Sequence, residues 1–85
     1  MTNTRARVCN AANRYATTHK GARPKYVHFT CRMEARILVE ATTGHGEALL
    51  GVATAQRIRE QGTRAALPSF LGYRIVWNAP RFKVT

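Results

Sequence analysis

Apolar and polar residues alternate strictly along residues 27–41, where every odd position is apolar. Side chains at alternate positions of a β-strand share one face, so this period of two predicts a strand with one buried and one solvent-exposed face. The alternating stretch, residues 25–41, is longer than an ordinary strand of about 3 to 10 residues, so we expect a break near residues 32–35. Because the alternation keeps its phase, a three-residue loop, a bulge or a bent continuous strand is favoured over a two-residue hairpin.

A helix is the competing interpretation of the second half of this stretch. Thr30 would cap that helix and Gly44 would end it. It would line up four apolar residues: Met33, Ile37, Leu38 and Ala41. For residues 34–42 we favour the strand, because the Val, Ile, Phe and Thr residues of the whole stretch suit a half-buried sheet.

Two further segments have helical spacing. Residues 4–16 follow a possible cap at Thr4 and bring together Val8, Ala11, Ala12 and Tyr15. Residues 46–62 form the clearest helix, which Gly62 would stop. Its stripe consists of Ala48, Val52, Ala55 and Ile58, with Gly51 at the edge. The polar segment 17–25, which contains a glycine and a proline, predicts a loop between the first helix and the alternating stretch.

The C-terminal segment predicts a hairpin. Residues 72–78 alternate aromatic or aliphatic side chains with polar ones, and residues 81–85 do the same after a turn. The predicted outline is a small α+β domain of order α-β-β-α-β-β, with a helix packed on an antiparallel sheet. We expect residues 1–85 to be one domain, made of a basic helix and loop arm (1–24) and a compact body (25–85).

Charge narrows the choice of partner more than any motif does. The 85 residues contain 14 Lys and Arg but only four acidic residues, all Glu, which gives a net charge of +10. A surplus of that size repels itself and is usually neutralised by a polyanion, most often nucleic acid. Eleven of the 14 bases are Arg, whose planar fork suits phosphate and base edges. We therefore predict a small basic protein that binds DNA or RNA.

The predicted contacts with phosphate come from the C-terminal hairpin and the N-terminal third. They are Arg5, Arg7, Arg14, Arg23, Lys25, Arg74, Arg81 and Lys83. Tyr15 and Tyr26 are interleaved with the N-terminal bases, where they could stack on unpaired bases, although we favour packing for both. The even positions of the alternating stretch mix both charges: His28, Arg32, Glu34, Arg36 and Glu40. Such a mixture predicts cross-strand pairing on a solvated face instead of a phosphate site.

Two hypotheses from other classes remain. One is a small interaction protein or inhibitor, of the kind that phages and mobile elements encode, which docks on an acidic protein or a nucleoprotein complex. The other is a ribonuclease toxin using His19, His28 or His45 as acid and base, although no spacing selects these residues. Four scattered Glu and no Asp disfavour a metal-dependent nuclease. We therefore predict a protein without catalytic activity.

Other features predict no special chemistry. The set Cys9, His19, His28 and Cys31 matches no metal-ligand spacing, so no metal or cofactor is expected. The sequence GHGE at 44–47 is better explained by a glycine turn than by a phosphate loop. Isolated cysteines, a start without an apolar leader and the lack of a long apolar run predict a soluble, cytoplasmic protein without a membrane partner. Exposed sheet edges would permit a homodimer.

Overall fold

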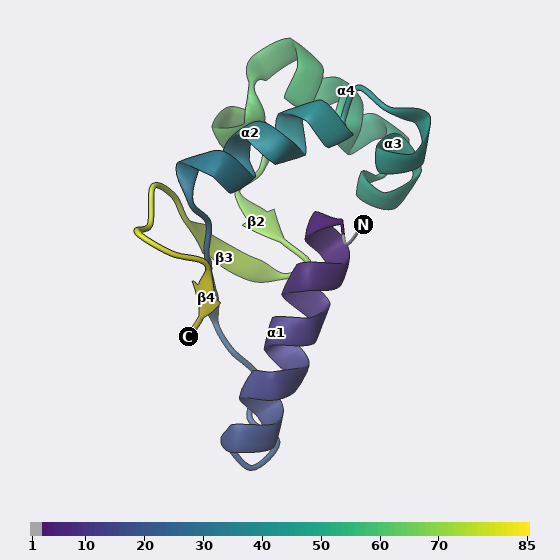
Figure 1. The fold of residues 1–85 in the computed structure, drawn as a ribbon. Coiled ribbons are helices and arrows are strands. Elements are labelled where there is room, and N and C mark those ends of the chain that lie inside the picture. Colours follow the sequence, from purple (N-terminus) through teal and green to yellow (C-terminus); the bar gives the residue numbers. More distant parts are fainter. Residues whose placement is uncertain (1–2) are drawn as a thin grey trace.

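The computed structural model describes residues 3–85 as an α+β domain of five helices and a small mixed sheet (Figure 1). In chain order the elements are α1 (Thr4–Thr18), β1 (Tyr26–His28), α2 (Cys31–Glu40), α3 (Gly44–Leu50), α4 (Val52–Gln61), α5 (Thr63–Ala66), β2 (Ser69–Phe70), β3 (Tyr73–Val76) and β4 (Lys83–Val84). The predicted fold class is confirmed. The predicted order is wrong at three places, each with a physical reason.

The first correction concerns residues 34–42, which belong to a helix and the turn after it, not to a strand. Thr30 is the N-cap of α2, and its side chain accepts a hydrogen bond from the backbone N–H of Met33. The alternation was ambiguous because every second apolar residue of it also recurs four positions later. Residues four apart lie on the same face of a helix. These residues are Met33, Ile37 and Ala41, and all three are buried, whereas Val39 between them is 62% exposed.

The second correction concerns residues 46–62, which form two helices instead of one. Gly51 has a φ of 93° and separates α3 from α4. This left-handed backbone conformation is available to glycine at little cost and ends the helical hydrogen bonding. The predicted stripe is divided accordingly: Ala55 and Ile58 are buried, but Ala48 and Val52 are exposed. Gly62 does stop α4, with a φ of 91°.

The third correction concerns the C-terminal hairpin. The sheet has the order β2-β3-β1-β4, so β1 lies between the two strands that the sequence paired with each other. β1 runs parallel to β3 and antiparallel to β4, and the sheet is mixed instead of purely antiparallel. A hairpin between neighbouring strands joins β2 to β3 through Leu71 and Gly72, whose φ values are 53° and 86°. Two positive φ values in a two-residue loop are typical of a type I′ turn.

The core lies on one face of this sheet. Val8 and Ala12 of α1 and Ile37 of α2 are buried together with Val27 of β1. The ring of Phe29 is fully buried, and three other aromatic rings lie within 6.4 Å of it: Phe70, Trp77 and Phe82. The first predicted helix is thus present and packs into the core, although its N-cap is Asn3 and not Thr4. Met1 and Thr2 of the predicted arm lie outside the described residues.

Candidate nucleic-acid interface

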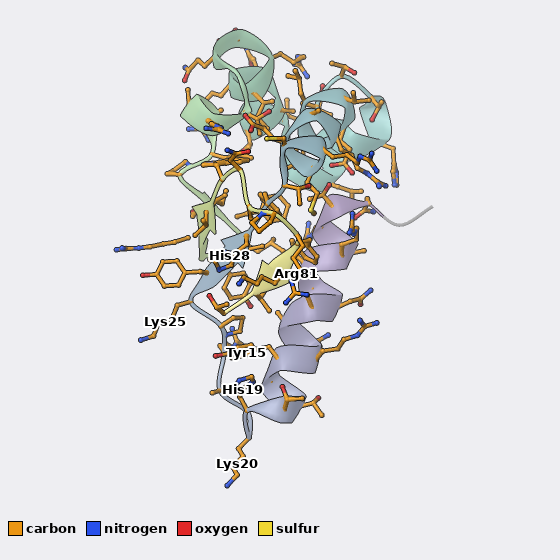
Figure 2. All side chains as sticks on the ribbon, turned by 60° about the vertical axis from the view of Figure 1, so that its left-hand side comes forward. Tyr15, His19, Lys20, Lys25, His28 and Arg81 are labelled. Atoms are coloured by element: carbon orange, nitrogen blue, oxygen red, sulfur yellow. The ribbon has the colours of Figure 1, made fainter. Side chains whose placement is uncertain are left out.

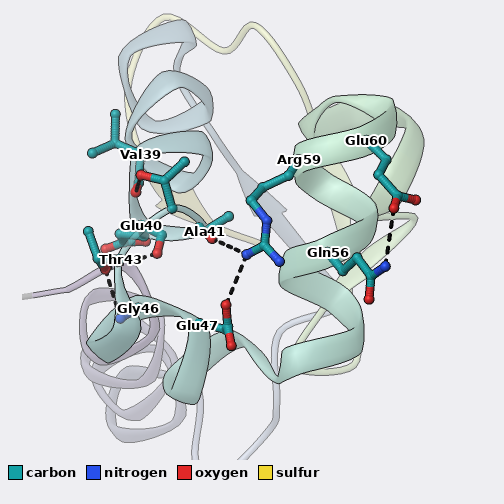
Figure 3. A network of polar contacts seen from close by, with 10 residues as sticks. Val39, Glu40, Ala41, Thr43, Gly46, Glu47, Gln56, Arg59 and Glu60 are labelled. Atoms are coloured by element: carbon teal, nitrogen blue, oxygen red, sulfur yellow. Dashed lines mark hydrogen bonds and ion pairs between the residues drawn. The ribbon is translucent and has the colours of Figure 1, made fainter.

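The four glutamates all lie on α2, α3 and α4, and each contacts a neighbouring side chain. Nε of Arg64 donates to both carboxylate oxygens of Glu34 at 3.0 Å. Nη1 of Arg59 lies 3.0 Å from Oε2 of Glu47 (Figure 3). The remaining contacts are Arg36 to Glu40 at 3.7 Å and Gln56 to Glu60 at 3.1 Å. Within residues 3–85, the three ion pairs therefore all lie among α2 to α5.

As a result, the charge is strongly divided between two parts of the protein. Residues 31–66 contain five Arg and four Glu, which leaves a net charge of +1. The rest of the chain, which includes α1 and the whole sheet, contains nine Lys and Arg and no acidic residue. Almost the entire surplus of +10 therefore belongs to α1, the sheet and the loops that join them.

The face of the sheet opposite the core presents side chains to solvent. The register places Tyr26 beside Arg74, and His28 between Val76 of β3 and Lys83 of β4. Tyr26 and Val76 are 39% and 37% exposed. We call this surface the open face and define it by Tyr26, His28, Arg74, Val76, Lys83 and Thr85. In Figure 2, α1 lies on one side of the sheet, and Lys25 at the start of β1 extends away from the molecule on the other.

His28 is the titratable group at the centre of the open face. Its Nε2 lies 2.9 Å from the hydroxyl oxygen of Thr85. Partial burial lowers the pKa of His28 below its usual value of 6.5, and the positive charge of Lys83 lowers that pKa further. The imidazole is therefore neutral at pH 7, and the open face carries its positive charge on lysine and arginine.

A second basic surface lies beside the edge strand β4. Two adjoining hollows share Arg7 and Phe82, and neither has a glutamate among its lining residues. The guanidinium carbon of Arg7 lies 5.1 Å from the centre of the Phe82 ring, which is a cation–π distance. We call this surface the arginine groove and define it by Arg7, Arg14, Arg32, Arg36 and Phe82. Phe82 directly precedes Lys83, so the groove and the open face lie on the two sides of one strand.

The structure places four of the eight predicted contact residues on these two surfaces. Arg74 and Lys83 lie on the open face, and Arg7 and Arg14 lie in the arginine groove. The prediction that Arg74, Arg81 and Lys83 project from a shared hairpin is wrong in its strand pairing, yet all three side chains are exposed.

The other predicted contacts lie apart from both surfaces or beside them. Arg5 donates a hydrogen bond to the carbonyl of Leu49 at 3.3 Å and so faces α3. Arg23 lines a hollow between α1 and Tyr73 of β3. Lys25 precedes β1 and is exposed, as Figure 2 shows.

Two residues of the arginine groove were not among the predicted phosphate contacts. Arg32 and Arg36 were assigned to a mixed strand face, but they lie four residues apart on α2, where such a spacing puts both on one side of a helix. The helix interpretation of residues 31–40 would have found this pair. Tyr26, for which packing was favoured, is exposed, whereas Tyr15 stacks on His19 with ring centres 3.8 Å apart.

Comparison of the chain with known proteins identified no relative. No protein-family model, curated protein or solved structure matches the chain. Charge, exposure and contacts of the described residues are therefore the observations from which a function can be inferred.

The remaining candidate motifs have ordinary structural surroundings. The backbone N–H of Gly46 in GHGE donates to the side chain of Thr43, which caps α3. His19 ends α1, His28 lies on β1 and His45 on α3, so the three histidines belong to separate elements. Within residues 3–85 we find no group of three or more His, Cys, Asp or Glu side chains placed to hold a metal ion. No helix in this part of the chain has the length and apolar character to span a bilayer.

Proposed function

We propose that this protein is a non-catalytic nucleic-acid-binding protein that acts inside the cell. The observation that carries the proposal is the division of charge: nine bases and no acid on α1, the sheet and their loops. Self-repulsion of this kind is relieved by a polyanion that covers the basic part. The two exposed thiols, Cys9 and Cys31, suit a reducing compartment.

The arginine groove supplies the backbone contacts in this proposal. Guanidinium groups offer planar pairs of N–H donors that match phosphate oxygens, and Arg14 and Arg32 are exposed at the two ends of the groove. Phosphate contacts of this type release counterions, so the binding constant should fall steeply as salt rises. Loss of the exposed Arg14 from the groove should make that dependence less steep.

The test is fluorescence anisotropy of labelled single-stranded RNA, single-stranded DNA and their duplexes across a salt series. We expect micromolar or tighter binding of at least one polymer at physiological salt. Arg14→Gln should weaken binding and lower the slope of log K against log salt by about 0.7 to 0.9. Arg57→Gln is the matched control, because Arg57 is also an exposed helical arginine but lies on α4 in the neutralised part; it should leave the slope unchanged.

Two outcomes would contradict the proposal. Loss of all binding by physiological salt would make the charge incidental to nucleic acid and would favour an acidic protein surface or a nucleoprotein complex as the partner. Equal effects of Arg14→Gln and Arg57→Gln would show attraction by net charge without a defined surface. Light scattering of the same samples gives the molar mass and so tests whether the protein forms the homodimer that exposed sheet edges would permit.

A further inference from the structure

The open face carries two rings on one strand. Tyr26 and His28 are two residues apart on β1, so they point to the same side of the sheet. β1 is an inner strand, flanked by β3 and β4, and the two rings therefore lie in the middle of the sheet and not at its rim. Of the tyrosines, Tyr73 faces the core side and Tyr15 is engaged by His19, which leaves Tyr26 as the exposed ring of the sheet.

Charge surrounds these rings on both sides. In the register of the sheet, Arg74 is the neighbour of Tyr26, and Lys83 is the neighbour of His28. The nearest uncharged neighbours are Val76 and Thr85, and the face contains no acidic side chain. An apolar partner would leave Arg74 and Lys83 without counter-charge, whereas a strand of nucleotides offers flat bases to the rings and phosphates to the cations.

We propose that the open face binds single-stranded nucleic acid, with one unpaired base stacked on Tyr26 and the next directed to His28. This inference rests on the proposed function and names the form of nucleic acid that the protein takes. Arg74 and Lys83 hold the phosphates that flank the two bases. The nucleic-acid strand then continues around the β4 edge of the sheet toward the arginine groove, where Phe82 and Arg7 lie.

The spacing of the rings selects single strands over duplexes. Two residues along a strand span roughly 6.6 Å, which is about twice the 3.4 Å rise between successive bases in a duplex strand. Bases that reach Tyr26 and His28 one by one must therefore be unstacked from each other. A duplex hides its base faces, so it could use only the phosphate contacts of the open face.

The decisive variant is Tyr26→Ala, measured by anisotropy against labelled oligonucleotides of about 12 nucleotides, within the site sizes typical of single-strand binders. The probes are oligo-uridine, oligo-thymidine and a duplex of equal length. Stacking of one base typically corresponds to a loss of affinity of about 5- to 140-fold on alanine substitution. We expect a loss in that range for the single strands, and little change for the duplex.

Three controls separate stacking from other effects. Tyr26→Phe keeps the ring and should stay within about twofold of the wild-type affinity. Tyr15→Ala removes a tyrosine from α1 and should leave binding unchanged. Tyr26→Ala should keep the salt slope of the wild type, whereas Arg74→Gln should lower that slope for single strands by about 0.7.

An independent readout does not depend on any variant. On titration with oligo-thymidine, the ring protons of Tyr26 and His28 should shift in NMR spectra, and those of Tyr15 should not.

The outcomes distinguish this inference from the proposed function. Tight duplex binding with unchanged single-strand affinity of Tyr26→Ala would overturn the inference and leave the proposed function standing. Failure of the wild type to bind any probe at physiological salt would overturn both. Equal preference of the two single-stranded polymers would support a site that reads bases and phosphates without the 2′-hydroxyl, and preference for oligo-uridine would support RNA as its ligand.

Discussion

Gly46 lies where the beginning of α3 comes closest to the end of α2. It is buried, and its N–H donates to the Thr43 hydroxyl at 2.9 Å, while that hydroxyl donates to the carbonyl of Glu40 at 3.0 Å (Figure 3). A Cβ atom at position 46 would come within 2.7 Å of the carbonyl carbon of Glu40 and of the Thr43 hydroxyl oxygen, and closer still to the Glu40 carbonyl oxygen. Gly44, two residues earlier, has nothing within 4 Å of the same imagined atom.

These contacts fix the sign of two substitutions. In an open helical position, alanine is favoured over glycine by roughly 1 kcal/mol, so Gly44→Ala should stabilise the protein by up to about that amount. Gly46→Ala receives the same gain but must displace backbone and a capping side chain, and overpacking of this kind typically costs about 1–3 kcal/mol. Because the displaced groups hold the cap of α3, we expect the upper end, which leaves a net loss of about 2 kcal/mol.

Urea unfolding at constant pH measures both variants. For a protein of this size, about 2 kcal/mol corresponds to a fall of about 8–16 °C in melting temperature and of roughly 1–2 M in the urea midpoint. The slope with urea should not change. A Gly46→Ala protein as stable as Gly44→Ala, or more stable than the wild type, would refute the close approach of α3 to the end of α2.

Three further predictions concern the core, the turn and pH. Phe29→Ala removes the ring at the centre of the aromatic cluster and should cost about 3–5 kcal/mol in denaturant unfolding; a loss below about 1 kcal/mol would contradict that central place. Leu71→Asn should stabilise by about 1 kcal/mol, since leucine occupies a left-handed position of the turn before Gly72 where asparagine is tolerated; thermal melts should show a higher midpoint. The lowered pKa of His28 means that the unfolded chain takes up its proton first as pH falls. The stability that His28 contributes should be fully present above about pH 6.5, which is the pKa of histidine in the unfolded chain. It should be lost as the pH falls through the pKa of His28 in the folded protein. Urea midpoints at several pH values should show this loss, and His28→Gln should reduce it.

The alternating stretch shows how a correct pattern can support the wrong element. Met33, Ile37 and Ala41 fit a period of two and a period of four equally well, so hydrophobicity alone does not separate strand from helix there. The decisive groups are local and polar: the Thr30 side chain satisfies the N–H of Met33 at the start of α2. Exposed Val39 is the residue that the strand interpretation most clearly misplaced.

The strand pairing could not be read from the chain because it depends on contacts between distant segments. Val27 is paired with Ile75 on one side and with Val84 on the other, which spans more than half of the sequence. Local turn signals predicted that β3 and β4 pair directly, and nothing local indicates that β1 enters between them. The two faces of these strands, however, follow from alternation alone, and the half-buried Ile75 and exposed Arg74 agree with it.

The position of the basic surfaces combines both kinds of information. That all four glutamates fall between residues 34 and 60 is visible in the sequence, and this alone divides the chain into a balanced and an acid-free part. The insertion of β1 then brings Tyr26 and His28 between Arg74 and Lys83, which no spacing in the sequence indicates. Repulsion between Arg74 and Lys83 opposes folding, and the open face contains no glutamate to offset it. A bound polyanion would supply the missing counter-charge on the same surface that offers it rings for stacking.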